Sequence, residues 1–490
     1  SVPSSTAYDY FLCVTTDFEG NPYPFFRDAE GRSSTISGAF ATPVASIVAD
    51  DSFTRPGAYA AGGVGTTTTL EIDRTKAYRR PFLGISTNGV FAPGATRVSY
   101  TVPAETVYAP FRAEAVYGTD WYVNAAAAND DGFGSTPETA RRTLASVLTN
   151  AYAGDCVHAA AGAYAEGGTK AFGSSDLILT RAVVPEGVSL VSDSPNGAAD
   201  TFIGGEIDTD EGNTQGCGPK AMRGVYLSKS ARLVGFTIRD GRTNDHRLST
   251  GDTSDKRAGG IYAWTDDDDL DAMPGIVDCV ITNCTGSRGG GFFGGNLHRT
   301  TIVDCHSIPG GNGPGGRTAR LYNCRAYGNT GAASGTAPLY MMYGVYNCTI
   351  GPADETSEYL AVYAHLNKFE GLVNTLFLGG SGGTLLTLES SSTFKSCVIS
   401  NNVARYAFTL PSKPAKVEVL YAGNNFGNAK GTVDADGRPA VDYEYVVDGG
   451  TLNDPFVTDI GDLALDGGGQ FAQKRHDDPR RPGCRNKYRT

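Results

Sequence analysis

Short runs of alternating apolar and polar residues recur through the second half of the chain, and most of them end near glycine or asparagine. They read LVGFTIRDG (233–241), IVDCVITNC (276–284), TIVDCHSIPG (301–310), RLYNCRAYGN (320–329), GVYNCTIGP (344–352), LVNTLFLGG (372–380) and FKSCVISNN (394–402). Alternation of this kind predicts short β-strands with one buried face. The recurrence predicts a solenoid, because a strand that cannot bury its apolar face alone can bury it against the next coil.

The runs align on one position, which is most often cysteine. The aligned residues are Phe236, Cys279, Cys305, Cys324, Cys348, Thr375 and Cys397. Their spacings of 43, 26, 19, 24, 27 and 22 residues predict one coil per interval, except that the first interval fits two coils. Glycine-rich stretches such as GGGFFGG (289–295) lie between the runs and predict turns, where glycine supplies unusual backbone angles.

Cysteine at this repeated position is expected to point into the core, in a ladder flanked by residues such as Ile281 and Ile350. We interpret these cysteines as small, polarizable core residues. Disulfides between coils are the alternative, although strands about 4.8 Å apart seldom offer suitable geometry. The spacing does not match clustered zinc ligands. Asn323 and Asn347 precede their cysteine whereas Asn283 follows its cysteine, so we expect asparagine to bond turn backbone rather than a ligand.

Residues 120–167 predict the entrance to this solenoid. Thr136 before Pro137 predicts a helix start, because a hydroxyl caps free amides and proline at the first helical position loses no needed hydrogen bond. An apolar face at helical spacing is formed by Leu144, Val147, Leu148 and Ala151. Gly154 ends this helix, and CVHAAA (156–161) resumes as a strand.

A strand followed by a capping helix and the pattern GDxVxxxxGxY resembles the entrance of right-handed parallel β-helix proteins of the pectate-lyase-like superfamily. The matching residues are Tyr122, Val123, Gly154, Asp155, Val157, Gly162 and Tyr164, and Ala160 replaces the more usual proline. The xNCxI strands and GGGxxG turns also resemble repeats of large exported bacterial surface proteins of the polymorphic outer-membrane type, and TDIGDLALDGGGQ (458–470) is similar to their last coil. The resemblance covers residues 120–490 and implies a fold rather than an activity.

These observations predict an all-β chain in three parts. Residues 1–117 form a small β-sandwich-like region, since TTTTLEID (66–73) and TRVSYTVP (96–103) alternate as antiparallel strands do. Residues 118–473 form a right-handed parallel β-helix with an N-terminal capping helix. Residues 474–490 form a basic tail. The 64 glycines, against four methionines and two tryptophans, agree with short strands and many turns.

The net charge of −12 makes a nucleic-acid partner improbable, because phosphate binding needs clustered cations. Since the tail carries +5, the remainder carries −17, and the tail is expected to dock on an acidic surface of its own or of a neighbouring copy. No run approaches the roughly 20 apolar residues of a membrane helix. The start at Ser1 is what a removed secretory signal leaves, so we expect an extracellular or cell-surface protein.

Two polar clusters are candidate sites. An acidic run consists of Asp266, Asp267, Asp268, Asp269 and Asp271. It is either a solvated loop, a calcium site of hard oxygen ligands or, least favoured, a catalytic element. The insert at 239–260 holds the lyase candidates Asp240, Asp245, His246, Lys256 and Arg257. A polysaccharide lyase needs a base, and cations that neutralise a uronate carboxylate. A mobile loop with weak ion pairs is the simpler interpretation.

The leading functional interpretation is a secreted or surface-displayed structural or adhesive protein, with head-to-tail self-association into a filament or layer. A polysaccharide lyase or a glycosidase is the second, and no cofactor other than calcium is expected. Non-catalytic glycan binding is the third, with candidate aromatic platforms at Phe292, Phe293, Tyr340 and Tyr343. His298 and Arg299 are expected on opposite faces of a strand and are therefore a poor catalytic pair.

Overall fold

A computed structural model describes residues 45–351, except 78, 105–109, 173–177, 211, 214, 245–253, 267–268 and 332–336. Outside this range it describes residues 362, 369–371 and 375, and the backbone of separate strands between 11 and 35 and between 360 and 428. The chain divides into two compact units, Ser1–Lys76 with Gly84–Val116, and Ala77–Leu83 with Tyr117–Thr490. Among the described residues, no helix is long and apolar enough to span a membrane.

The first unit is built from short strands in three sheets. Strands β1 (Phe11–Thr16), β2 (Pro22–Arg27) and β3 (Ser33–Thr35) form one antiparallel sheet. A second sheet has the order β5 (Gly57–Ala60), β4 (Ser46–Ala49), β10 (Phe111–Tyr117), β7 (Phe82–Thr87) and β8 (Val90–Pro93). Strands β6 (Thr67–Glu71) and β9 (Arg97–Thr101) pair antiparallel, as their alternation predicts. The short helix α1 covers Arg74–Ala77.

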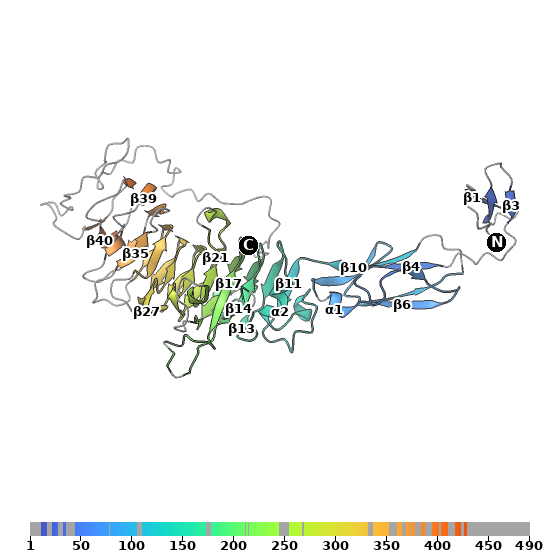
Figure 1. The fold of residues 1–490 in the computed structure, drawn as a ribbon, viewed down its shortest axis with the longest axis horizontal. Helices are drawn as coiled ribbons and strands as arrows, with labels where there is room; N and C mark the ends of the chain where they lie inside the picture. The colour runs from blue at the N-terminus through green and yellow to red at the C-terminus, as the bar shows by residue number, and fades with distance from the viewer. Residues whose placement is uncertain are drawn as a thin grey trace, which may run out of the picture. The chain divides into compact units, whose positions relative to one another are not determined.

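The second unit is a parallel β-helix of stacked strands (Figure 1). Its strands form three faces, and the coils from β12 to β38 contribute one strand to each face. The first face consists of β11 (Asp120–Val123), β12 (Cys156–Ala159), β15 (Ser189–Ser192), β18 (Arg232–Val234), β21 (Gly275–Val277), β25 (Asn296–His298), β29 (Arg320–Tyr322), β33 (Gly344–Tyr346), β36 (Gly371–Val373), β39 (Phe394–Ser400) and β41 (Val417–Ala422). The pairs from β11 to β36 are parallel and in register, and the pair of β39 with β41 is parallel with a register shift between Phe394 and Cys397.

The strands of the other two faces are also parallel, with register shifts in the pairs β32–β35 and β40–β42. The second face consists of β13 (Gly162–Tyr164), β16 (Thr201–Gly204), β19 (Thr237–Arg239), β22 (Val280–Thr282), β26 (Thr301–Val303), β30 (Arg325–Tyr327), β34 (Thr349–Ile350), β37 (Leu376–Phe377), β40 (Val403–Thr409) and β42 (Phe426–Asn428). The third consists of β14 (Leu179–Val184), β17 (Met222–Leu227), β20 (Ile261–Ala263), β24 (Phe292–Phe293), β28 (Gly316–Arg317), β32 (Leu339–Met342), β35 (Leu360–Ala364) and β38 (Thr384–Thr387). A side sheet adds β23 (Thr285–Arg288), β27 (His306–Asn312) and β31 (Thr330–Gly331).

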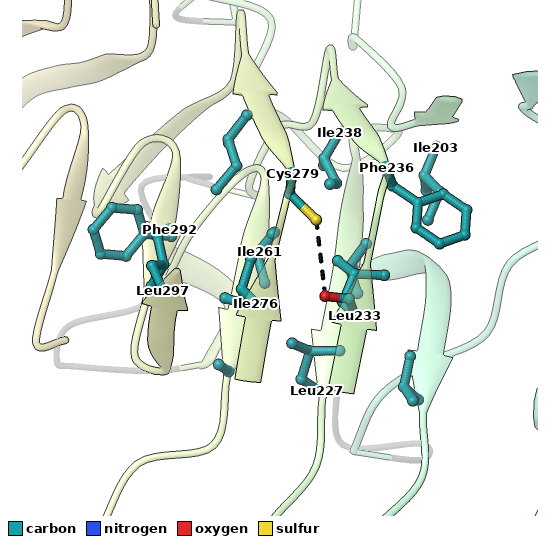
Figure 2. Close-up of a cluster of buried hydrophobic side chains, with 14 of the residues drawn as sticks. Ile203, Leu227, Leu233, Phe236, Ile238, Ile261, Ile276, Cys279, Phe292 and Leu297 are labelled. Atoms are coloured by element: carbon teal, nitrogen blue, oxygen red, sulfur yellow. Dashed lines mark hydrogen bonds between the residues drawn. The ribbon is translucent and has the colours of Figure 1, made fainter. Parts of the chain in front are cut away.

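Stacked aliphatic columns fill the interior of the coils. The first face contributes Val157, Leu190, Leu233, Ile276, Leu297, Leu321 and Val345, all fully buried. The second contributes Ile203, Ile238, Ile281, Ile302, Ala326 and Ile350. Figure 2 shows members of these columns converging on one core. Each fully buried leucine or isoleucine contributes about 1.5–3 kcal/mol, so the columns supply the main driving force for coil stacking.

The coils turn at two corners that share one chemistry. At the first corner a residue with positive φ follows a strand of the first face, at the second corner it follows a strand of the second face, and at both corners a buried residue comes next. At the first corner φ is 78° at Gly235, 53° at Asp278, 48° at Arg299, 56° at Asn323 and 53° at Asn347. At the second corner φ is 60° at Asp240, 48° at Asn283, 52° at Asp304 and 64° at Gly328. Asparagine, aspartate and glycine tolerate this left-handed conformation best, so the asparagines are corner residues at two different corners.

Where the buried corner residue is cysteine, threonine or asparagine, its side chain also donates to a backbone carbonyl. The Cys279 thiol donates to the carbonyl of Val277 at 3.2 Å and lies 3.8 Å from that of Leu233 in the preceding coil (Figure 2). Thr300 makes the same contact, donating from Oγ1 to the carbonyl of His298 at 3.1 Å. From Cys279 onward the ladder is therefore made of small side chains with a donor, cysteine or threonine.

The predicted ladder is correct at Phe236, Cys279, Cys324, Cys348 and Thr375 and wrong at Cys305. Strand pairing places Thr300 opposite Cys279, and Cys305 opposite Cys284 at the second corner. The tetrapeptide IVDC occurs at 276–279 and again at 302–305, so the sequence alignment matched two corners whose local chemistry is the same. Asn329 continues the second corner, accepting from the Cys305 amide and donating to the Ile302 carbonyl, both at 3.0 Å.

Two further expectations need correction. Val398 of β39 pairs with Gly371, the first residue of β36, so Cys397 lies one residue before this pair. Thr375 lies after the end of β36, so Cys397 is not opposite Thr375. The 43-residue interval is one coil with an insert, because Arg232 pairs directly with Gly275. A loop inserted between strands leaves their pairing unchanged, so spacing alone did not reveal the coil number.

The predicted capping helix is two short elements. A 3₁₀ turn, η1 (Pro137–Thr139), starts at Thr136, whose hydroxyl accepts from the Thr139 amide as predicted. Helix α2 (Leu144–Leu148) has its own N-cap at Thr143. The break falls at Arg141, which pairs its backbone with the first face and whose buried guanidinium donates to the carbonyl oxygens of Gly132 and Ser146. The predicted apolar face, Leu144, Val147, Leu148 and Ala151, is buried.

Remaining short elements are the 3₁₀ turns η3 (Gly197–Ala199), η4 (Ser254–Lys256) and η5 (Leu270–Ala272). Cysteines 217, 279, 284, 305, 324 and 348 are free and buried, whereas Cys156 is disulfide-bonded. Buried free thiols agree with the interpretation of the ladder as core packing.

Burial raises the pKa of the Cys279 thiol to about 12, so the native ladder is expected to resist alkylation. Iodoacetamide labelling followed by peptide mass spectrometry should leave Cys279, Cys284, Cys305, Cys324 and Cys348 unmodified under native conditions and modify all five in denaturant. Rapid native labelling of any of the five would show that its coil opens.

Gly316 is expected to be intolerant of a larger side chain. A Cβ there would lie 2.0 Å from the Phe292 ring of the preceding coil, so Gly316→Ala should destabilise the protein by about 1–3 kcal/mol through overpacking. Denaturant unfolding measures this change. Gly275→Ala is the matched control, because its Cβ meets only Arg232 atoms at 3.8 Å or more and should cost little. Adding Phe292→Leu should recover part of the loss; no recovery would refute the packing explanation.

Candidate functional site

The predicted lyase residues are not brought together where the structure describes them. Asp240 lies at the second corner of its coil, and its carboxylate accepts a hydrogen bond from the Asn283 side-chain amide at 2.6 Å. Arg257 lies outside the third face, where it donates to the Tyr262 hydroxyl at 2.9 Å and covers the Phe293 ring. Lys256 is half-buried in η4. Asp245 and His246 lie outside the described residues.

The described part of the acidic run is engaged by cations of the protein. Asp269 caps η5 and pairs with Lys229 at 2.9 Å. Asp271 faces Arg320 at 3.4 Å. Asp266 is exposed and has partners of its own, and Asp267 and Asp268 lie outside the described residues. Calcium binding by this run therefore stays a prediction.

The predicted aromatic platforms are mostly internal. Phe292 and Tyr343 are fully buried, and Phe293 is 5% exposed. Tyr340 is half-buried beneath the Arg317 guanidinium, 5.2 Å from its ring centre. Phe292 belongs to the inward column of the third face, because the glycines around it leave a place for its ring in the core.

The outer side of the first face carries a column of aromatic and aliphatic side chains, one from each coil. We call the outward residues Val234, Val277, His298, Tyr322 and Tyr346 the aromatic row. All five are half-buried. The rings of His298 and Tyr322 stack at 4.7 Å and 7°, and those of Tyr322 and Tyr346 at 5.0 Å and 10°. This stacking follows from in-register strand spacing of about 4.8 Å.

A parallel polar row lies two residues earlier in each strand and consists of Arg232, Gly275, Asn296 and Arg320. Gly275 presents no side chain, and the Cγ and Nε atoms of Arg232 lie 3.8 and 4.0 Å from the place of its missing Cβ. The Asn296 side-chain oxygen is buried without a hydrogen-bond partner in the described structure.

The cations of this face differ in how they are paired. Arg299 forms a bidentate pair with Asp278, with Nε–Oδ1 at 2.6 Å and Nη2–Oδ2 at 2.7 Å. Arg320 forms a bidentate pair with Glu370 and is largely buried. Arg232 is exposed, and among the residues described it has neither an ion pair nor a hydrogen bond from its guanidinium. Arg232 is thus the cation of this face that remains available to an anion.

His298 is held neutral at this site. Burial, and after it the charges of Arg299 and Arg232, lower its pKa to about 4. His298 and Arg299 diverge as expected, one lying in the aromatic row and the other at the corner. The sequence signal for the aromatic row was present in the repeated NLH (296–298), RLY (320–322) and GVY (344–346), where an aromatic residue ends each strand.

Comparisons with known proteins add a distant structural likeness. No family model and no curated protein matches the chain. Among solved structures, the chain is similar to one described as a rhamnogalacturonan lyase, with 14% identity and a TM-score of 0.36, over 68% of this chain and 90% of that chain. A likeness at this level does not extend to activity.

The electrostatics of the site predict a pH effect through His298. The pKa of His298 is about 4 in the folded chain and about 6.5 in the unfolded chain. The neutral His298 side chain therefore contributes fully to the free energy of unfolding above pH 6.5, and this contribution is lost as the pH falls toward 4. His298→Tyr keeps the stack and should weaken the pH dependence of unfolding. NMR should place the titration of the His298 imidazole near pH 4 and shift it upward in Arg232→Ala; titration near 6.5 would contradict this picture.

Proposed function

We propose that this chain is a non-catalytic glycan-binding solenoid that acts as an adhesive protein outside the cell, with an acidic polysaccharide as its ligand. The single observation that supports this proposal most is Arg232, an exposed guanidinium without a partner in the described structure, beside Gly275, which presents no side chain. A guanidinium binds a carboxylate through two parallel hydrogen bonds, which suits a uronate.

The aromatic row gives a polymer a track along the solenoid. Its residues repeat once per coil, so a chain lying parallel to the solenoid axis would meet Val277, His298 and Tyr322 in succession. The rings stack on each other, so the row offers their edges and the Tyr322 hydroxyl rather than open ring faces. Contacts of this type favour sugar oxygen atoms over an extended length rather than one deep subsite.

The geometry of the candidate acids and bases favours binding over cleavage. A lyase needs a base and a neutralising cation at one point of the substrate. Asp240, Arg257 and Asp271 lie at a corner, outside the third face and beside the first face respectively. Self-association through residues 474–490 stays part of the proposal, although this tail lies outside the described residues.

Oligogalacturonate is the probe for the proposed ligand class. Calorimetry should show salt-sensitive binding to the full chain that falls at least tenfold in Arg232→Ala, since a charge-assisted hydrogen bond is worth about 1.5–3 kcal/mol. The methyl-esterified oligomer, which lacks the charge, should bind the wild type weakly.

Arg325→Ala is the matched control, because Arg325 is an exposed arginine on the second face. Equal loss of binding in both arginine variants would indicate nonspecific charge attraction and refute the assigned face. Unsaturated uronate ends, detected by ultraviolet absorbance after incubation, would instead show that the chain is a lyase.

A further inference from the structure

We infer that the outer side of the first coils binds a divalent transition metal ion through His158 and Asp120, with Asp193 orienting the histidine. These residues come from β12, β11 and the end of β15, which pair in register. The site lies on the same outer side of the first face, in earlier coils: Asp120 shares a column with Arg232, and His158 shares a column with Val234. Metal binding there does not depend on the proposed glycan binding.

The two contacts of the His158 ring differ in a way that suits a metal ligand. Nδ1 lies 2.8 Å from Asp193 Oδ1, which is an ordinary charge-assisted hydrogen bond. Nε2 lies 3.4 Å from Asp120 Oδ1, which is long for such a bond. Two ligand atoms about 2.0–2.2 Å from one tetrahedral zinc ion are separated by about 3.3 Å. The observed separation therefore fits two atoms that share an ion.

The Asp193 contact is the usual support of a metal-binding histidine. A carboxylate that accepts from Nδ1–H fixes the ring orientation, so Nε2, once it has lost its proton, directs its lone pair toward Asp120. The Tyr122 ring stacks on the imidazole at 5.0 Å and 18°, which restrains its rotation. His158 and Asp120 are thus held in place by neighbours that need not move when an ion binds.

The donor set identifies the class of ion. One imidazole nitrogen and one carboxylate oxygen suit zinc, cobalt, nickel or copper, whereas calcium prefers six to eight oxygens. The sulfur of Cys156 lies within 4.8 Å of both ligand atoms, but Cys156 is disulfide-bonded and is not counted as a ligand. Two protein ligands leave the remaining positions to water, so we expect a modest affinity and an exchangeable site.

Calorimetric titration of the full chain with zinc chloride in chelator-treated buffer tests the inference. We expect binding that excess calcium does not displace. His158→Ala should weaken it at least tenfold, and Asp193→Asn should weaken it about tenfold because the loss of a charged outer partner costs 10- to 100-fold. Circular dichroism checks that each variant is folded.

His306→Ala is the matched control and should bind zinc like the wild type. His306 also lies outside the coils, but its Nδ1 contacts the Thr330 hydroxyl and not a carboxylate. Cobalt substitution should give visible absorption bands that disappear in His158→Ala. An absence of zinc binding, or binding equal in His158→Ala and wild type, would overturn the inference; in that case His158 only links the two carboxylates as an imidazolium.

Discussion

Parallel pairing in exact register is the constraint on which the solenoid depends. Each strand is too short to bury its apolar face by itself, and it becomes stable because the same position of the next coil covers it. Register forces like residues into columns, so leucine stacks on isoleucine inside, and tyrosine stacks on histidine outside. The core, the corners and the outer rows are consequences of this one repeat.

The corners show what the repeat requires chemically. The chain must leave a sheet at each corner, so a backbone carbonyl near the apolar interior loses its partner in the sheet. A buried carbonyl without a hydrogen bond is costly. Cys279, Thr300 and Asn329 meet this requirement with a thiol, a hydroxyl and an amide. The residue before each of them adopts positive φ, which explains the recurrence of Asp-Cys and Asn-Cys pairs without any role in metal binding or redox chemistry.

Much of the fold was predictable because the pattern of burial is local. The inward position of Cys279, the pairing of β6 with β9 and the burial of Leu144 follow from alternation and helical spacing. The register of Cys305 was not predictable, because two corners use the same tetrapeptide and only strand pairing distinguishes them. The site was missed for a related reason. Arg232, Gly275 and Asn296 are far apart in sequence and become neighbours only when the coils are in register.

The 43-residue coil has a consequence for how such a chain can change over time. Its insert lies between strands that still pair as they do in coils of 21 or 24 residues, so the added segment does not change the register of the core strands. A solenoid of this kind can therefore acquire, lose or exchange loops at a corner without refolding. Its surface loops can therefore change toward new ligands while the strand register keeps the interior the same. The same corner is a suitable place for inserting a foreign peptide.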